Sequence, residues 1–255
     1  KDMNIREACN PLDIIFREKD HKYFSEVNEN HVSVTTVLKD YMIPFPADAA
    51  KKYAKKHNRT LEDVQKEWDW KRDLGTEIGS WLHIQLENQL QNKIPDLDYL
   101  LTKSDTPERQ KDKDGYIANY HIQIANYLAS IKHLDYLGSE IIVGNKTNAG
   151  QIDTLFSQCI HDFKNDKEIN FESWSYTNWQ GIKISKKMLP PFEDLDDCNW
   201  NKYCLQVNMY HYLLPEEIQN CFSEPHKIIK FDRFSKEYEI HEIPDWQDRI
   251  KQIME

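Results

Sequence analysis

The sequence contains no apolar run that approaches the roughly 18 residues needed to cross a bilayer. Its opening segment, KDMNIREACN, lacks the apolar stretch of a secretory signal. The five cysteines form no CxxC pair, and an odd number of cysteines without an export signal is typical of reduced thiols. These absences predict a protein of the cytoplasm that does not enter a membrane.

Glycine and basic charge are also scarce. Only seven of the 255 residues are glycine and no segment repeats, which argues against a fibrous or disordered design. The formal net charge of −10 argues against a broad basic surface for nucleic acid. A divalent metal can nevertheless neutralise clustered carboxylates where a phosphate approaches, and lysine-rich segments can form a local groove. Net charge alone therefore does not exclude a nucleic-acid partner.

The hydrophobic content of 39% is enough to bury one sizeable core, so we expect a single domain over residues 1–255. Apolar and polar residues alternate between positions 13 and 38, which predicts an N-terminal β element within residues 1–45. The spacing then becomes helical over residues 46–134, with Thr60 as the N-cap of a long helix. We expect this part to be a helical insertion.

Residues 135–255 change character. Short β-rich pieces separated by turn residues predict strands, an irregular loop follows over residues 176–199, and helical spacing then resumes. Two further strands and a short helix from Pro244 complete the chain; the strand segments are SEIIVGN, GQIDTLF, CIHDFK, HKIIKFDRF and EYEIHEI. The order of elements predicts an α/β fold with a central mixed sheet flanked by helices.

The tripeptide Asp162-Phe163-Lys164 is the first candidate for chemistry. Strand alternation sets the acid and the amine on one face, with Phe163 on the other. If Ser157 and Gln158 form a tight turn, Asp153 lies directly opposite Asp162, with Cβ atoms about 4.5–5.5 Å apart. Two carboxylates at this spacing repel each other unless a cation lies between them.

Such a site suits phosphodiester hydrolysis. Carboxylate oxygens hold Mg²⁺ or Mn²⁺, the metal polarises the phosphate and acidifies a water molecule, and the Lys164 ammonium steadies a developing oxyanion. The alternative is a cross-strand salt bridge on an exposed face of the sheet.

Gly75, Gly79 and His83 recur every four residues and form one helical stripe, with Glu87 a turn further on. Glycine costs a helix about 1 kcal/mol relative to alanine, so two on one face indicate that another backbone or a phosphate strand comes close. The alternative for His83 is an ordinary core or surface histidine.

Several further residues are secondary candidates. Gln206 and Tyr210 lie one helical turn apart, although core packing explains them equally well. Glu140 precedes Asp153 by one strand and could add a carboxylate or simply be solvated. The loop lysines could meet phosphates or form a solvated charge run; they are Lys183, Lys186 and Lys187.

The order of these motifs resembles the RecB-like branch of the PD-(D/E)XK nucleases, which share a restriction-endonuclease-like fold and include phage lambda exonuclease. The match runs from about residue 75 to 214. The resemblance implies that metal is held by His83, Asp153, Asp162 and the Phe163 carbonyl, and that Lys164 is the catalytic lysine. Gln206 and Tyr210 match the Q-x-x-x-Y motif, which implies a role in support and DNA positioning. The stretch KKMLPPFEDLDDCNWNKY resembles bacteriophage members, particularly those of Bacteroidetes hosts.

Some relatives hold an iron–sulfur cluster with one upstream cysteine and three closely spaced downstream. Here Cys198 and Cys204 precede Gln206, and Cys221 stands alone, so we expect no cluster. The expected cofactor is one or two Mg²⁺ or Mn²⁺ ions.

The sequence therefore predicts a metal-dependent deoxyribonuclease, an exonuclease of phage or bacterial DNA recombination, replication or degradation. The expected substrate is linear DNA, single- or double-stranded, and a recombination or replication protein could be a partner. A phage-encoded enzyme would act in the host cytoplasm. The alternatives are a structure-specific endonuclease and a catalytically idle module that binds DNA ends or proteins and antagonises host defence.

Overall fold

A computed structural model describes residues 4–93 and 101–255. Across these residues the fold is α/β, and its largest sheet has six strands. In order they are β10 (Tyr238–Glu242), β9 (Lys227–Phe231), β6 (Ile160–Lys164), β5 (Asn148–Phe156) and β3 (Val32–Ser33), while β4 (Tyr136–Gly144) also pairs with β5. The β6–β9 and β3–β5 pairs are parallel and the others antiparallel, so the predicted mixed sheet is confirmed.

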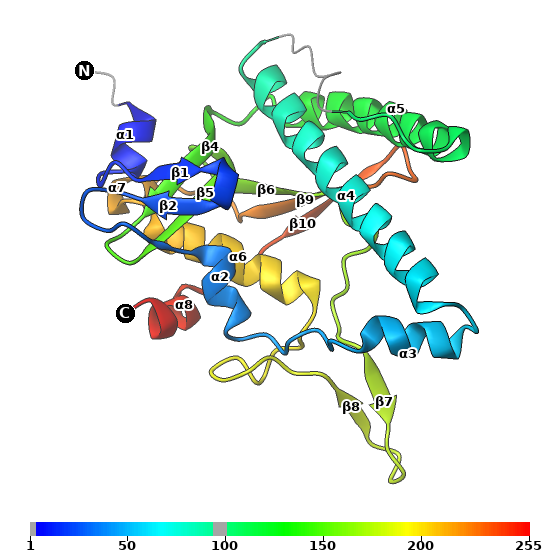
Figure 1. Cartoon of the computed structure of the whole chain (residues 1–255). Coiled ribbons are helices and arrows are strands. Elements are labelled where there is room, and N and C mark those ends of the chain that lie inside the picture. The colour runs from blue at the N-terminus through cyan, green and yellow to red at the C-terminus, as the bar shows by residue number, and fades with distance from the viewer. Residues whose placement is uncertain (1–3, 94–100) are drawn as a thin grey trace.

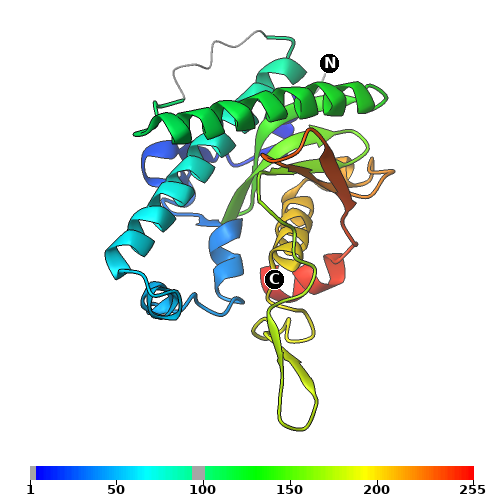
Figure 2. The same ribbon diagram turned by 90° about the vertical axis from the view of Figure 1, so that its right-hand side faces the viewer.

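Helices cover both faces of this sheet (Figures 1 and 2). On one face, α4 (Leu61–Leu90) and α5 (Pro107–Ser130) enclose a core that includes Trp81, Tyr127 and Phe163. On the other face, α6 (Asn199–Leu213) packs with α2 (Val34–Lys39), α8 (Gln247–Met254) and α1 (Ile5–Cys9). None of the helices that the structure describes combines the length and apolar character needed to span a bilayer.

The long helix α4 begins where its cap predicts. The side chain of Thr60 accepts a hydrogen bond from the backbone N–H of Asp63 at 3.1 Å, which satisfies one of the free donors of the first turn. Thr106 caps α5 in the same way, with Pro107 in its first turn. The helix α5 ends at Ser130, slightly before the predicted limit near Leu134.

The N-terminal part is less purely β than predicted. Strands β1 (Ile15–Arg17) and β2 (Lys22–Phe24) form the expected antiparallel pair, with a short 3-10 turn between them. The segment VSVTTVL, expected to be a strand, is instead mostly helix α2. Ser33 caps this helix by accepting a hydrogen bond from the Thr36 N–H, and Val34 and Leu38 bury one face of it.

The region expected to be an irregular loop, residues 176–199, contains part of a two-stranded hairpin. Strands β7 (Ser175–Thr177) and β8 (Lys183–Ser185) pair antiparallel and project from the body of the molecule (Figures 1 and 2). The final helix α8 begins at Gln247 rather than at Pro244. Two short helices complete the described chain, α3 (Ala49–Lys56) and α7 (Glu216–Gln219). Residues 94–100, within the predicted helical part, lie outside the described residues.

Candidate functional site

The hairpin of β5 and β6 carries the two candidate aspartates. Ser157, Gln158 and Cys159 separate the two strands, and the Phe156 N–H donates to the Cys159 carbonyl at 2.9 Å across the predicted Ser157–Gln158 turn. Thr154 pairs with His161. Continued by one residue, this register sets Asp153 opposite Asp162. The period of two in a strand thus brings the two acids to neighbouring positions at the end of the paired region.

Three side chains from three elements form a cluster next to this hairpin. His83 of α4, Glu140 of β4 and Asp153 of β5 each offer one ligand atom within 4.8 Å of the others. Nδ1 of His83 lies 3.5 Å from Oδ1 of Asp153 and 3.8 Å from Oε1 of Glu140. The second oxygen of Asp153 accepts a hydrogen bond of 2.7 Å from the backbone N–H of Phe163, which fixes the carboxylate.

An unusual backbone conformation positions Glu140. Its φ of 52° lies in the left-handed region, which costs a residue with a side chain roughly 1–2 kcal/mol. The guanidinium of Arg6 donates to the carbonyls of Ser139 at 2.7 Å and Glu140 at 3.3 Å, and so binds the chain on both sides of this kink. The strand irregularity therefore aims a carboxylate at the cluster.

Asp162 and Lys164 form a separate pair on β6. Oδ2 of Asp162 lies 2.6 Å from Nζ of Lys164, and the Asp162 side chain is only 2% exposed. The contact is an ion pair inside the protein. The Lys164 ammonium also lies 4.7 Å from the centre of the Tyr203 ring. Asp162 and Lys164 therefore neutralise each other away from solvent.

Gln206 and Tyr210 connect helix α6 to this pair. Nζ of Lys164 donates to Oε1 of Gln206 at 3.5 Å, and the amide of Gln206 donates to the Tyr210 hydroxyl at 2.7 Å. The Tyr210 ring packs on Gly150 of β5, where an added Cβ would lie only 2.5 Å from Cε1 of the ring. Tyr210 is therefore both a core residue and the outer end of a polar chain that reaches Lys164.

The charged groups of the site shift one another's pKa values. Burial, reinforced by Asp153 and opposed by Lys164, raises the pKa of Asp162 to about 6. Burial also raises the pKa of Asp153, although His83 and Lys164 oppose it. Burial lowers the pKa of His83, but the carboxylates of Asp153 and Glu140 outweigh it and raise this pKa to about 9. At neutral pH the His83 imidazolium therefore lies beside both carboxylates, and it would have to lose its proton to act with them as a ligand of a divalent ion.

The glycines of α4 lie beside Asn165, the residue that follows strand β6. Nδ2 of Asn165 donates to the carbonyl of Gly75 at 2.9 Å, and a Cβ on Gly79 would lie 3.1 Å from the same nitrogen. Arg233 in turn donates to the carbonyl of Asn165 at 3.3 Å. The sequence predicts a backbone or a phosphate strand at both glycines, but the structure places the Asn165 side chain against Gly79, and a Cβ on Gly75 would lie 4.0 Å from Nη2 of Arg233. The sequence gives no signal for Asn165 beyond its position after Lys164.

A cavity of about 890 Å³ opens beside the cluster. His83, Glu140 and Asp153 line it, and Glu87 faces it while accepting a hydrogen bond of 3.0 Å from Gln91. The rest of its wall comes from the β1–β2 hairpin, α4, β5 and α6; among these residues are Phe16, Glu18, His21, Tyr23, Gln151 and Tyr210. The cluster is therefore open to a ligand larger than water.

The loop lysines are paired with carboxylates. Lys186 lies 2.8 Å from Asp197, and Lys187 lies 2.6 Å from Asp196. Neither lysine lines the cavity beside the cluster. Any phosphate contact by these side chains would have to replace an existing ion pair.

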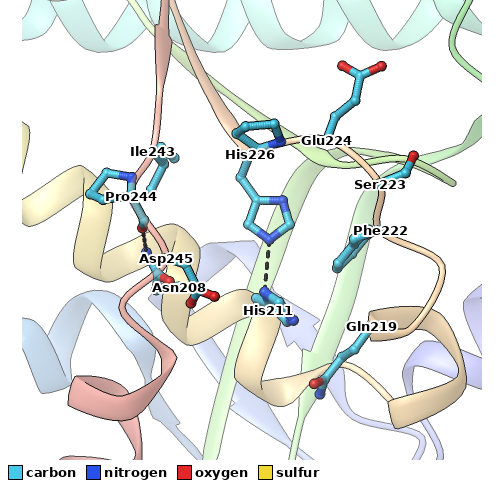
Figure 3. A pocket seen from close by; sticks show the side chains of 11 residues that line it. Asn208, His211, Gln219, Phe222, Ser223, Glu224, His226, Ile243, Pro244 and Asp245 are labelled. Carbon is cyan, nitrogen blue, oxygen red and sulfur yellow. Dashed lines mark hydrogen bonds between the residues drawn. The ribbon is translucent and has the colours of Figure 1, made fainter.

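A second cavity, of about 420 Å³, contains a histidine pair (Figure 3). Nδ1 of His226 accepts a hydrogen bond from the Ile160 N–H at 3.1 Å, so its proton is on Nε2, 2.9 Å from Nδ1 of His211. Burial, reinforced by His211, lowers the pKa of His226 to about 3. Burial lowers the pKa of His211 as well, so both rings are held neutral.

No protein-family model matches this chain, and no curated protein matches it either. The function is therefore inferred from the site itself.

Proposed function

We propose that the chain is a metal-dependent deoxyribonuclease of the PD-(D/E)XK type, in its RecB-like branch, and that it digests DNA from an end. The observation that carries the proposal is the proximity of two arrangements on one hairpin. Strand β5 contributes Asp153 to the cluster with His83 and Glu140. The neighbouring strand β6 carries the Asp162–Lys164 pair. A cation site beside a buried ammonium is what the hydrolysis of a phosphodiester requires.

His83, Glu140 and Asp153 would hold Mg²⁺ or Mn²⁺, with Asp162 as a further ligand. When bound, such an ion polarises the phosphate and acidifies a water molecule. The donor set agrees with this choice because carboxylate oxygens are the preferred ligands of both ions and imidazole is accepted by Mn²⁺ more readily than by Mg²⁺.

Lys164 would contribute positive charge at the reacting phosphate. Burial lowers the pKa of this amine, but Asp162 and Asp153 outweigh burial and raise it, so the group remains an ammonium at neutral pH. Gln206 contacts the same nitrogen and would restrict its position while a phosphate oxygen is bound. The chain's own residues would thus orient the substrate and stabilise its negative charge.

The decisive experiment incubates the purified protein with end-labelled linear DNA and with closed circular DNA, each single- and double-stranded. Mg²⁺, Mn²⁺ and EDTA are compared. Asp153→Asn removes one ligand charge, and Asp248→Asn, a fully exposed aspartate far along the chain, is the matched control. We expect metal-dependent loss of linear DNA in the wild type and the control, and none in Asp153→Asn.

Cleavage of circles would make the enzyme an endonuclease. Absence of cleavage with either metal would refute the proposal in favour of a binding module. Full activity of Asp153→Asn would remove the metal site from this cluster.

A further inference from the structure

The hairpin of β7 and β8 has an apolar face that no other described part of the chain covers. Tyr176 pairs with Ile184, and strand alternation sets Trp174 and Ile182 on the same side. Trp174 is 75% exposed, and Trp179 at the turn is 90% exposed. The opposite face is polar, with Ser175, Thr177, Lys183 and Ser185. The exposure is therefore confined to one surface, which we call the aromatic face.

The base of this hairpin is anchored while its tip is free. Asp196 accepts hydrogen bonds of 3.0 Å from the Ser173 N–H and from the Ser185 hydroxyl, one on each side of the strand pair. Beyond this anchor the hairpin projects away from the sheet (Figures 1 and 2). A two-stranded hairpin gains little stability alone, and a contiguous exposed apolar surface marks an interaction site.

A lysine lies beside the aromatic face. Residues 173–192 contain three lysines and no carboxylate, and since Lys186 and Lys187 pair with Asp197 and Asp196, Lys183 is the one on the hairpin strands. Lys183 pairs only with the exposed Glu172, and exposed ion pairs contribute so little that a phosphate can replace the carboxylate. The Trp174 and Tyr176 rings are 5.5 Å apart and tilted by 32°, side by side along one strand. Exposed aromatic rings beside lysines bind unpaired bases and their phosphates.

The hairpin also continues directly from the candidate site. The chain leaves β6 at Lys164, and Asp166 binds the hydroxyl of Tyr203, whose ring contacts the Lys164 ammonium. The segment then runs to the hairpin without another helix between them. A short segment of residues 165–174 therefore joins the hairpin to the strand that carries Asp162 and Lys164.

We propose that the aromatic face binds the bases of single-stranded DNA and holds that strand while its end lies at the metal cluster. The inference rests on the proposed function, because it names the form of DNA that the nuclease would hold. It assigns base stacking to Trp174, Tyr176 and Trp179, and phosphate contact to Lys183.

The test measures binding separately from cleavage. Fluorescence anisotropy of a labelled single-stranded oligonucleotide and of a labelled duplex is recorded with the full chain in EDTA. Trp174→Ala, Tyr176→Ala and Trp179→Ala are compared with Phe234→Ala, an exposed aromatic residue of the β9–β10 turn that is 60% exposed. We expect each hairpin variant to weaken single-strand binding about tenfold, with a change under about twofold for the duplex and for Phe234→Ala.

Unchanged single-strand affinity in the hairpin variants overturns the inference, as does a wild type that binds no single strand. A wild-type dimer that becomes a monomer in Trp174→Ala, with unchanged DNA affinity, would instead assign the face to a second copy of the chain. Hairpin-dependent binding without any cleavage would support this inference while removing the proposed nuclease activity. Cleavage with hairpin-independent binding would do the reverse.

Discussion

The side-chain amide of Asn165 donates a hydrogen bond of 2.9 Å to the backbone carbonyl of Gly75, and this bond joins strand β6 to helix α4. The same helix carries His83 two turns further on. Because Asp153 reaches the cluster from the neighbouring strand β5, the position of α4 against β6 determines the separation of two candidate ligands. Asn165 is therefore a positioning residue.

Gly79→Ala tests this contact. An added methyl group would lie 3.1 Å from Nδ2 of Asn165, so the amide must retreat and its bond, worth about 1 kcal/mol, weakens. Gly115→Ala on helix α5 is the matched control, since nothing lies within 4 Å of its added methyl group. In urea titrations we expect Gly115→Ala to raise the free energy of unfolding by about 0.5–1 kcal/mol. The free energy of unfolding of Gly79→Ala should be at least about 1 kcal/mol lower than that of Gly115→Ala. An equal gain in both variants would contradict the positioning role.

Glu140 offers a second prediction, because glycine favours its left-handed backbone. Glu140→Gly and Glu140→Ala both remove the carboxylate, but only glycine also relieves the conformational strain. We expect the free energy of unfolding of Glu140→Gly to be about 1 kcal/mol higher than that of Glu140→Ala. Calorimetric titration with Mn²⁺ should show weakened binding in both. Wild-type Mn²⁺ affinity in either variant would exclude Glu140 as a ligand.

The Asp162–Lys164 pair predicts a strong stability coupling. Lys164→Met leaves the buried Asp162 carboxylate without its cation, which costs about 3–5 kcal/mol. The double variant Lys164→Met with Asp162→Asn removes that unpaired charge, so we expect it to recover much of the loss while remaining inactive. Chemical unfolding in EDTA measures both changes. Additive effects of the two single substitutions would argue against a direct pair.

His226 predicts a loss of stability in acid. Its pKa is about 6.5 in the unfolded chain and about 3 in the folded one, so the folded state excludes a proton that the unfolded state binds. The stabilisation is complete above pH 6.5 and declines as the pH falls towards 3, by roughly 2 kcal/mol between pH 7 and 5. His226→Asn, which keeps an acceptor for the Ile160 N–H, should flatten this decline. His133→Asn, at an exposed site, should leave the decline unchanged. If the free energy of unfolding fell equally with pH in both variants, His226 would not be its cause.

Gln206→Ala separates support of the site from core packing. The glutamine contacts the Lys164 ammonium and the Tyr210 hydroxyl, both at polar atoms. We expect cleavage to fall about 10–100-fold with Mn²⁺ affinity retained. A large drop in melting temperature together with unchanged specific activity would instead assign Gln206 to packing.

Local patterns predicted the parts of the site that depend on local geometry. The β5–β6 hairpin follows from alternation, and its short turn determines the register that brings Asp153 and Asp162 together. The cap of α4 at Thr60 likewise depends on its own first turn. The helix at Val34–Lys39 could not be predicted in this way, because its β-branched residues favour strands and only burial of Val34 and Leu38 selects the helix.

Contacts between distant segments account for what the sequence could not predict. The Asn165 bond to Gly75 spans 90 positions, and the Arg6 bond to Ser139 spans 133. The sequence indicated Glu140 only as a secondary candidate, because its approach to His83 and Asp153 depends on a kink in β4. The spacing of apolar and polar residues predicts which face of a helix or strand a side chain lies on. It does not predict which residue of another element that side chain contacts.

The packing of Tyr210 on Gly150 has an evolutionary consequence. No side chain fits at position 150 while a tyrosine occupies position 210. A related protein can therefore have a larger residue at position 150 only if the residue at position 210 is smaller than tyrosine. Such a change would also remove the hydroxyl that Gln206 binds. Substitutions at these three positions should therefore be inherited together, and the correlated pattern would mark lineages in which the polar chain to Lys164 has been rebuilt or abandoned.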